Sequence, residues 1–487
     1  MYKSTRDVES KLINVSEAII NGIASDGGLY IIDKIPNIEI NQLINLSYQE
    51  LATKIMSLYL NDFKYDDINK IVNQAYDNKF DEGILKLKST KDCSFLELYH
   101  GRTCAFKDMA LSVLPLLLKK SKEINNVESN TIILAATSGD TGSAALSGFQ
   151  NIEGIKIVVI YPNSGVSMIQ EKQMLSFSGD NAKVIAINGN FDDAQNLVKR
   201  TFLDQNLVSV QLSSANSINI GRLIPQIVYY FWGYLEMVRN KQIKLNEQIN
   251  YVVPTGNFGN ILAGYMAKRM GLPINKLICA SNKNNVLTDF FNNGLYNKNR
   301  EFIKTISPSM DILISSNLER LLYYISGSSS KTKEFMNSLK ENGEYFIDDE
   351  MKHRLNDFVA YFASDDETLE AIKEIYIKDN YLIDTHTAVA YVAYKKYLLE
   401  KKDNIKTIIV STASPFKFPK AVCKALGINT EEKDDLKLIN ILENYTSIKA
   451  PKGLTNLPNK EKTIWIEKNT FNNKIEKLLK EMDTSEL

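Results

Sequence analysis

The sequence has little cysteine, histidine or tryptophan, and it carries no net charge. Its 487 residues include 4 Cys, 3 His and 2 Trp. Four cysteines in a chain of this length exclude a disulfide-stapled scaffold, and none of them forms a C-x-x-C pair. With so few histidines a Cys/His zinc module is excluded as well, and we predict no metal site.

The charges are balanced and the apolar runs are short. The chain has 58 Lys and Arg against 58 Asp and Glu, which argues against a large basic surface for nucleic acid. The longest apolar run, at 111–118, falls far short of the ~20 residues that span a bilayer. The N-terminus lacks the apolar core of a secretory signal. We therefore expect a cytoplasmic protein with no nucleic-acid or membrane partner.

The texture of the sequence predicts three parts. Residues 1–93 are polar, with helical periodicity over 43–60 and no catalytic pattern, so they are expected to form an accessory domain. Residues 94–430 are expected to form the catalytic core, with a smaller subdomain over about 130–220. The tail, 431–487, mixes both signs of charge and is expected to be a solvated C-terminal extension.

Within the core, short apolar runs alternate with amphipathic stretches. This alternation predicts an α/β fold with largely parallel sheets. The expected strands are 131–136, 155–161, 182–187, 250–254, 277–281 and 407–411. The polar stretches 283–300 and 327–335 are expected to be loops. Because ligands of such folds bind at the carboxyl ends of the strands, the turns there are the candidate site.

Lys107 is the first candidate for chemistry. It follows small and apolar residues and precedes the run at 111–118. A partly desolvated lysine favours the neutral amine, which suits Schiff-base formation. The alternative is an ordinary surface lysine at the start of a helix.

Two turns after expected strands could bind anions. Thr137–Gly142 (TSGDTG) would direct backbone N–H groups and hydroxyls at a carboxylate, although a plain capped turn is the alternative. Gly256–Asn260 (GNFGN) would bring the backbone and a helix N-terminus close to a phosphate. Its spacing fits neither nucleotide-binding glycine motif, so the ligand stays open, as does an ordinary glycine turn.

Two further segments carry polar groups in suggestive places. Residues 214–222 (SANSINIGR) place an arginine at an expected helix start, where its planar fork suits carboxylate or phosphate. Residues 411–418 (STASPFKF) place a hydroxyl after a late strand. Helix capping and a simple turn are the respective alternatives.

The order and spacing of these segments resemble the fold-type II pyridoxal-phosphate enzymes, and among them most closely the threonine synthase family. The stretches that carry the resemblance are 100–108, 137–142, 170–174, 214–222 and 254–260, together with 25–30 and 384–390. The resemblance covers roughly residues 1–430. It implies a fold of the tryptophan synthase β type, with two open, mostly parallel sheets flanked by helices and an N-terminal accessory domain.

The resemblance also implies the cofactor, pyridoxal 5'-phosphate, and its residues. Lys107 would carry it as a Schiff base, and Thr412 would face the pyridine nitrogen. Ser138 and Asp140 would lie near its ring oxygen and the substrate carboxylate. Its phosphate would be bound by the glycine loop, which we define as Gly256, Asn257, Phe258, Gly259 and Asn260.

The implied reaction converts O-phospho-L-homoserine and water to L-threonine and phosphate, the last step of threonine biosynthesis. It proceeds by γ-elimination of phosphate and β-addition of water, with Lys107 as general base and acid. The enzyme would be a monomer or a homodimer. The substrate-binding candidates are Thr137, Ser138, Lys172, Ser214, Asn216, Asn219 and Arg222.

Two positions depart from the family pattern. Arg102 stands where the family usually has proline, and Ser414 stands where it usually has histidine, although Thr412 and Lys417 match. The alternatives are a phospho-lyase or a serine/threonine dehydratase, both giving a 2-oxo acid and ammonia, and a non-catalytic relative. Arg222 and Lys172 argue against the dehydratase and the intact Lys107 against the non-catalytic relative, while the phospho-lyase stays open.

Overall fold

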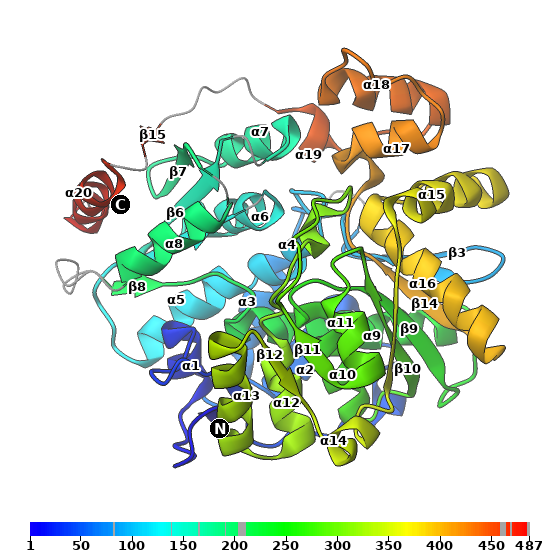
Figure 1. The fold of residues 1–487 in the computed structure, drawn as a ribbon. Coiled ribbons are helices and arrows are strands. Elements are labelled where there is room, and N and C mark those ends of the chain that lie inside the picture. The colour runs from blue at the N-terminus through cyan, green and yellow to red at the C-terminus, as the bar shows by residue number, and fades with distance from the viewer. Residues whose placement is uncertain are drawn as a thin grey trace.

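The computed structural model describes residues 1–80, 83–137, 139–163, 166–189, 191–202, 211–457, 464–467 and 470–484. Two sheets dominate the fold (Figure 1). The six-stranded sheet has the order β13 (Phe358–Phe362), β10 (Ile274–Ser281), β9 (Ile249–Pro254), β14 (Thr407–Ser411), β4 (Ser94–Glu97), β3 (Lys86–Ser89). The five-stranded sheet has the order β15 (Ile464–Ile466), β7 (Ala182–Ile187), β6 (Ile155–Pro162), β5 (Thr131–Ala136), β8 (Gln211–Ser213).

Every neighbouring pair in these two sheets is parallel except β3 with β4. Their central strands are buried along their length, as expected of parallel strands covered on both faces. The predicted pair of open, mostly parallel sheets is therefore confirmed, and each of the six predicted strands is present.

Helices cover both faces of each sheet. On the five-stranded sheet lie α6 (Asp140–Phe149), α8 (Phe191–Phe202) and α20 (Phe471–Thr484), with α7 (Met168–Ser176) packed on α6. On the six-stranded sheet lie α10 (Gly259–Arg269), α16 (Thr385–Lys401) and α9 (Ile220–Arg239). Gly233 brings α9 close to that sheet, because a Cβ there would meet Leu96 and Tyr251 at 3.0 and 3.1 Å.

The N-terminal region packs on the core through its helices. The strands β1 (Tyr2–Ser4) and β2 (Tyr30–Ile32) form a separate antiparallel pair. Helix α1 (Val15–Asn21) packs on α5 (Leu114–Ile124), α2 (Tyr48–Ser57) packs on α9, and α3 (Tyr65–Ala75) packs on α2. The helix expected over 43–60 begins later, at Tyr48, because Ser47 and Glu50 form a capping box there.

Both stretches predicted as loops contain regular structure, so that prediction is wrong. Residues 283–300 include α11 (Val286–Asn293) and β11 (Leu295–Asn297). Residues 327 and 328 connect α12 (Leu318–Ser326) to α13 (Ser329–Glu341), and the rest of the stretch 327–335 lies in α13. Ser328 caps α13, and a few widely spaced apolar residues bury one face of an otherwise polar helix.

Between β11 and β14 the chain also forms β12 (Glu344–Phe346), which pairs with β11, and then α14 (Asp349–His353) and α15 (Asp365–Asp379). Among the described residues, no helix is long and apolar enough to cross a membrane.

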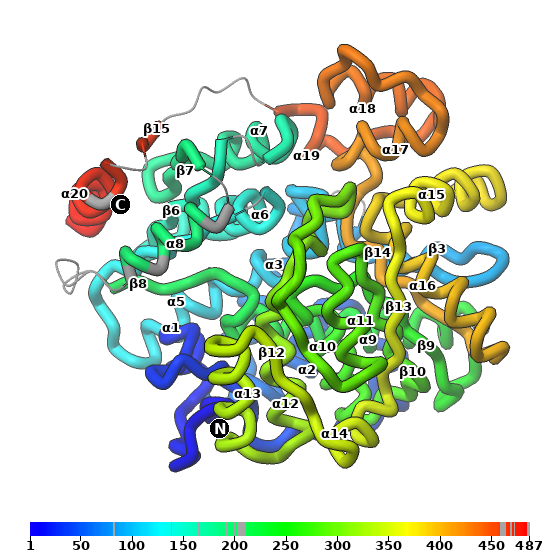
Figure 2. The backbone as a smooth tube through the Cα atoms, viewed as in Figure 1, coloured from blue at the N-terminus to red at the C-terminus, as the bar shows by residue number. Residues whose placement is uncertain are grey.

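The C-terminal tail is more than a solvated surface. After α17 (Pro419–Ala425), which lies within the predicted core, the tail forms α18 (Asp435–Thr446), α19 (Lys452–Thr455), β15 and α20. Figure 2 shows α17 and α18 on the side of the six-stranded sheet, and β15 and α20 on the side of the five-stranded sheet. Ile466, Phe471 and Leu479 are buried in an apolar cluster there, which the charge pattern of the tail did not predict.

Candidate active site

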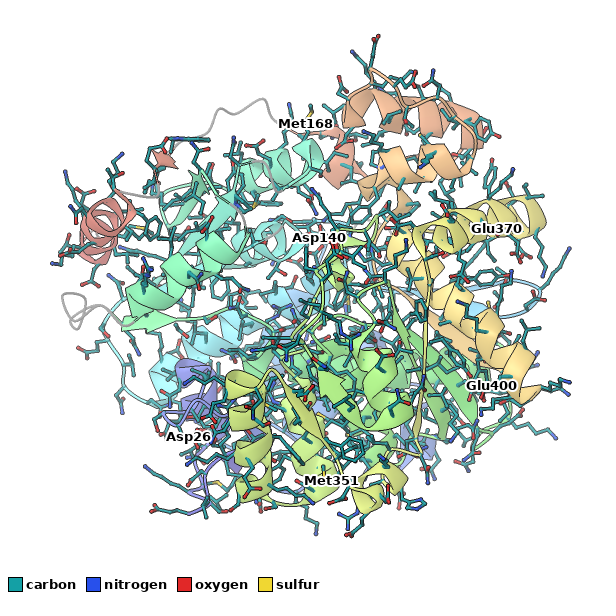
Figure 3. All side chains as sticks on the ribbon, viewed as in Figure 1. Asp26, Asp140, Met168, Met351, Glu370 and Glu400 are labelled. Carbon is teal, nitrogen blue, oxygen red and sulfur yellow. The ribbon has the colours of Figure 1, made fainter. Side chains whose placement is uncertain are left out.

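The candidate site lies where strands of both sheets end. Asp140 follows β5, the glycine loop follows β9, and Thr412 follows β14. Figure 3 labels Asp140 near the middle of the molecule. The carboxyl ends of parallel strands are where ligands of α/β folds bind, so this placement agrees with the predicted site.

Lys107 is the first residue of the short helix α4 (Lys107–Leu111), and its side chain is only 13% exposed. Its Nζ lies 3.4 Å from Ser309 Oγ and 3.7 Å from Asp140 Oδ2. Burial lowers the pKa of this amine to about 8, and the charges of Lys417 and Arg222 contribute against the opposing effect of Asp140. A substantial neutral fraction near neutral pH is what Schiff-base chemistry requires.

The loop before Lys107 is held from both sides. The carboxylate of Asp108 accepts hydrogen bonds from the Thr103 backbone N–H at 2.8 Å and from the Thr103 hydroxyl at 2.7 Å. The Phe106 N–H donates to the Thr412 carbonyl at 2.8 Å. These bonds fix Lys107 beside the segment that follows β14.

Asp140 is a buried carboxylate between two lysines. Its Oδ1 lies 3.0 Å from Lys417 Nζ and accepts a hydrogen bond from Gln170 Nε2 at 2.8 Å. Its Oδ2 accepts from Ser309 Oγ at 3.2 Å. Burial by itself would raise the pKa of this carboxyl, but the ammonium groups of Lys417 and Lys107 hold it well below its usual range. Asp140 is therefore a fixed negative charge facing Lys107.

Asp384, His386 and Ser309 also belong to this network, although they were not predicted as site residues. His386 Nδ1 lies 2.7 Å from Asp384 Oδ2, while its Nε2 accepts the Ser309 backbone N–H at 3.2 Å. This pairing places the ring proton on Nδ1 and fixes the position of Ser309. Asp384 and His386 stand in a stretch that resembles the family, but Ser309 stands in a short turn with no local motif.

The glycine loop is shaped for an anion. Phe258 has a φ of +63°, and α10 begins at the next residue, so the first N–H groups of the helix have no intrahelical acceptor. Among the described residues, none accepts a hydrogen bond from the backbone N–H groups of 256–260. A Cβ at Gly256 would lie 2.6 Å from the Ser309 carbonyl oxygen, so only glycine fits. Asn260 Nδ2 is buried and has no partner in the described part of the chain.

Arg222 offers a second set of donors. It is buried near the start of α9, and its Nη1 donates to the Ala215 carbonyl at 3.1 Å. Its Nε has no hydrogen-bond partner among the described residues. Burial lowers the pKa of the guanidinium to about 10, so the group still carries its charge at neutral pH. A buried cation with a free N–H is suited to an anionic ligand.

The other expected residues of this segment have local roles. Asn219 caps α9, with Oδ1 accepting from the Gly221 N–H at 2.9 Å and Nδ2 donating to the Ile19 carbonyl at 3.0 Å. Ser214 Oγ accepts the Asn216 N–H at 3.2 Å. Helix capping, the alternative given for this segment, is therefore what the structure shows for Asn219, and its bond to the Ile19 carbonyl is a further structural contact.

The remaining candidates fall in three places. Thr137 Oγ1 accepts from the N–H groups of Gly139 and Gly142 at 3.0 and 2.8 Å, which shapes the turn into α6. This helix begins at Asp140, so the predicted turn is shorter than 137–142. Thr412 is buried at the end of β14, and Lys172 is half-buried on α7. Ser138 lies outside the described residues.

Ser414 and Arg102, the two residues that depart from the family pattern, differ in burial. Ser414 is buried and caps the short turn Pro415–Lys417, where its Oγ accepts the Phe416 N–H at 3.4 Å. Arg102 is exposed. Ser414 therefore helps to deliver Lys417 to Asp140, whereas Arg102 has no buried role.

Comparison with known proteins agrees with this architecture along the whole chain. The family model "Threonine synthase N terminus" matches residues 1–76, "Pyridoxal-phosphate dependent enzyme" matches 94–412, and "Threonine synthase, C-terminal" matches 387–469. The threonine synthases of Saccharomyces cerevisiae and Schizosaccharomyces pombe are 37% and 39% identical to it. Each alignment covers 88% of this chain and 89% of the relative.

The chain belongs to the threonine synthase family. Among solved structures, yeast threonine synthase superposes with a TM-score of 0.89 at 34% identity, and threonine synthase from Brucella melitensis with pyridoxal phosphate bound superposes with 0.88 at 33%. Both cover 99% of each chain. The match to threonine synthases confirms the predicted fold class, and the match over 94–412 confirms the predicted pyridoxal-phosphate dependence.

Proposed function

We propose that this chain is a threonine synthase, which converts O-phospho-L-homoserine and water to L-threonine and phosphate with pyridoxal 5'-phosphate as its cofactor. The observation that carries the proposal is Lys107, a buried amine with a pKa of about 8 that faces Asp140. Two sets of buried anion donors accompany it: the glycine loop and Arg222. A substrate and a cofactor that each carry a phosphate need two such sets.

The residues present fit the cofactor. Lys107 would hold it covalently, and the backbone N–H groups of the glycine loop would bind its phosphate, with Asn260 Nδ2 as a further donor. Thr412 would face the pyridine nitrogen, and Ser138 and Asp140 would lie by the ring oxygen. When bound, the cofactor supplies an electron sink for charge at the substrate Cα.

Lys107 is the group to which we assign proton transfer at the substrate Cα and at the neighbouring carbon. Its amine donates a hydrogen bond to Ser309 Oγ at 3.4 Å and forms an ion pair with Asp140 Oδ2 at 3.7 Å, and these two contacts set its position. Asp140 stabilises the protonated form of the amine, while burial favours the neutral form. The balance keeps both forms accessible near neutral pH.

Arg222 is the residue to which we assign the substrate phosphate, with Lys172, Ser214 and Asn216 as its partners. Phosphate leaves more readily when cationic donors stabilise its charge. Asn219 would act through the start of α9, which carries Arg222. Thr137 and Ser138 would lie by the substrate carboxylate.

We further propose the wider setting that the sequence indicates. The chain would comprise an accessory domain over 1–93, a catalytic core over 94–430 with a smaller subdomain at about 130–220, and an extension over 431–487. It would act in the cytoplasm as a monomer or homodimer, without nucleic acid.

The experiment that tests the function measures phosphate and threonine together, from purified protein supplied with O-phospho-L-homoserine. Equal release of both is expected, and Lys107→Ala should abolish both along with the near-visible absorbance of the bound cofactor. Phosphate accompanied by 2-oxobutyrate and little threonine would identify a phospho-lyase instead. Cofactor absorbance without phosphate release would mean that the substrate is wrong.

A further inference from the structure

Arg320 is a fully buried cation on α12 that the proposed reaction does not use. Its Nε donates to the Tyr30 carbonyl at 2.9 Å, and its Nη2 donates to the Ile218 carbonyl at 2.6 Å. Its Nη1 donates to Asn317 Oδ1. One guanidinium therefore joins the N-terminal region, the 214–222 segment and the turn that precedes α12. Helix α12 lies beside the N-terminal elements in Figure 1.

Asn317 extends these contacts to the glycine loop. Its backbone N–H and its Nδ2 both donate to the Asn257 carbonyl, at 3.1 and 2.9 Å. Its Nδ2 also lies 3.4 Å from Ser217 Oγ. Through Asn317, Arg320 is thus connected to both segments to which the proposed function assigns a phosphate.

Attachment of the N-terminal region does not by itself explain a buried arginine. The neighbouring Glu319 already provides that attachment, since it accepts hydrogen bonds from Thr5 Oγ1 at 2.6 Å and from Arg6 Nε and Nη2 at 2.8 and 2.7 Å. In the described part of the chain, no carboxylate pairs with Arg320. The charge of the neighbouring Glu319 acts on Arg320 without a direct ion pair. A buried charge without a direct ion pair is a poor source of stability, but a planar fork of donors fixes several acceptors in one geometry.

We propose that Arg320 is a positioning residue that holds the glycine loop and the 214–222 segment in register, so that their two anion sites form together. The proposal rests on the proposed function, which assigns the cofactor phosphate to one segment and the substrate phosphate to the other. Lysine in place of Arg320 keeps the charge but loses the fork, so both anions should bind more weakly. Turnover should change less, because Arg320 contacts neither Lys107 nor Asp140.

Arg320→Lys is the test, and Arg239→Lys is its matched control. Arg239, on α9, also joins the N-terminal region to the core, with bonds to the carbonyls of Ile44 at 2.7 Å and Leu46 at 2.8 Å, but it touches neither segment. We expect Arg320→Lys to weaken the Kd of the apoprotein for pyridoxal phosphate about tenfold and to raise KM about tenfold, with kcat within about threefold. Arg239→Lys should leave Kd and KM unchanged.

The proposal is overturned if the Tm falls by the same amount in Arg320→Lys and Arg239→Lys while neither Kd nor KM changes. Arg320 would then contribute to the stability of the fold alone. If Arg320→Lys does not fold, Asn317→Ser removes the side-chain bonds of residue 317 to Arg320 and to the Asn257 carbonyl, while it keeps the arginine and the backbone bond to that carbonyl. An unchanged Kd and KM in that variant would also overturn the proposal. A wild-type protein that binds cofactor but makes no threonine would refute the proposed function, whereas the cofactor Kd and hydrogen exchange over 214–222 and 256–260 would still test Arg320.

Discussion

At the scale of single residues, the site is organised by charge. Lys417 and Arg222 are buried cations, Lys107 is partly buried, and Asp140 is the buried anion that faces the two lysines. Burial, aided by the charges of Lys417 and Arg222, lowers the pKa of Lys107 against the opposing effect of Asp140. The ammonium groups of Lys417 and Lys107 stabilise Asp140 as a carboxylate. The excess positive charge suits a site that receives two phosphates.

The lowered pKa of Lys107 predicts how cofactor binding depends on pH. The neutral amine is the reactive form, and the folded protein releases the proton near pH 8. The rate at which apoprotein takes up pyridoxal phosphate should therefore rise with pH through about 8 and then level off. Stopped-flow absorbance measures the midpoint, the pH at which the uptake rate is half its maximum. An uptake rate that stays constant between pH 7 and 9, the range on either side of the Lys107 pKa of about 8, would contradict Lys107 as the reacting amine.

Lys417→Met should move that midpoint to higher pH. Removing the cation leaves Asp140 free to stabilise the protonated Lys107, and it removes a repulsive charge. The same titration measures the shift. Lys395→Met, which removes an exposed lysine paired with Glu374, is the control and should leave the midpoint in place.

Gly256 is the residue whose size matters most in the glycine loop. In Gly256→Ala the new Cβ would approach the Ser309 carbonyl oxygen to 2.6 Å, and a backbone atom cannot easily move aside. We expect cofactor affinity to fall about tenfold, as a displaced loop loses one or more charge-assisted hydrogen bonds. Gly179→Ala, whose nearest neighbour lies at 3.9 Å, should leave the affinity measured by absorbance titration unchanged.

At the scale of elements, the loop before Lys107 is held by a helix from far along the chain. Gly453, on α19, packs so closely that a Cβ there would lie 2.3 Å from the Arg102 carbonyl oxygen. Gln173, on α7, donates to the Gly453 carbonyl at 2.9 Å and to the Thr103 carbonyl at 3.3 Å. These contacts restrain a loop that lacks the proline usual at position 102.

Gly453→Ala should therefore separate α19 from this loop. We expect the free energy of unfolding to fall by about 1–3 kcal/mol, which is typical of overpacking. Urea denaturation measures the loss, and Gly179→Ala, whose new methyl group would meet only Gln150 Nε2 at 3.9 Å, serves as the control. Equal stability of the two variants would show that α19 moves aside without cost.

At the scale of the whole molecule, the C-terminal tail connects the two halves. From α17 and α18 beside the six-stranded sheet, the chain reaches β15, which pairs with β7 at the edge of the five-stranded sheet. Helix α20 then covers that sheet with Phe471, Ile475 and Leu479. Burial of these side chains stabilises the packing of the tail on this sheet.

A chain that ends at Leu457 should lose the edge strand and this apolar cover. Backbone amides of β7 should then exchange hydrogen faster, because their parallel partner and their shield from water are gone. Hydrogen-exchange mass spectrometry measures this, with β9 at the centre of the other sheet as the internal control. Unchanged exchange in β7 would show that the tail does not stabilise this half.

Local apolar patterning was enough to predict six strands of the two sheets and the turns that follow them. The roles proposed for Lys107 and the glycine loop also came from residues near one another in the chain. Local patterning missed α11, which buries Val286, Leu287 and Phe290, because polar residues surround this short apolar segment in the chain. It also missed α13, whose polar composition hides a narrow buried face. Only the tertiary structure brought Ser309 to Asp140, a partner 169 residues away, and Arg320 to Tyr30, 290 residues away. Such contacts depend on how the sheets and helices pack, and no local pattern encodes them.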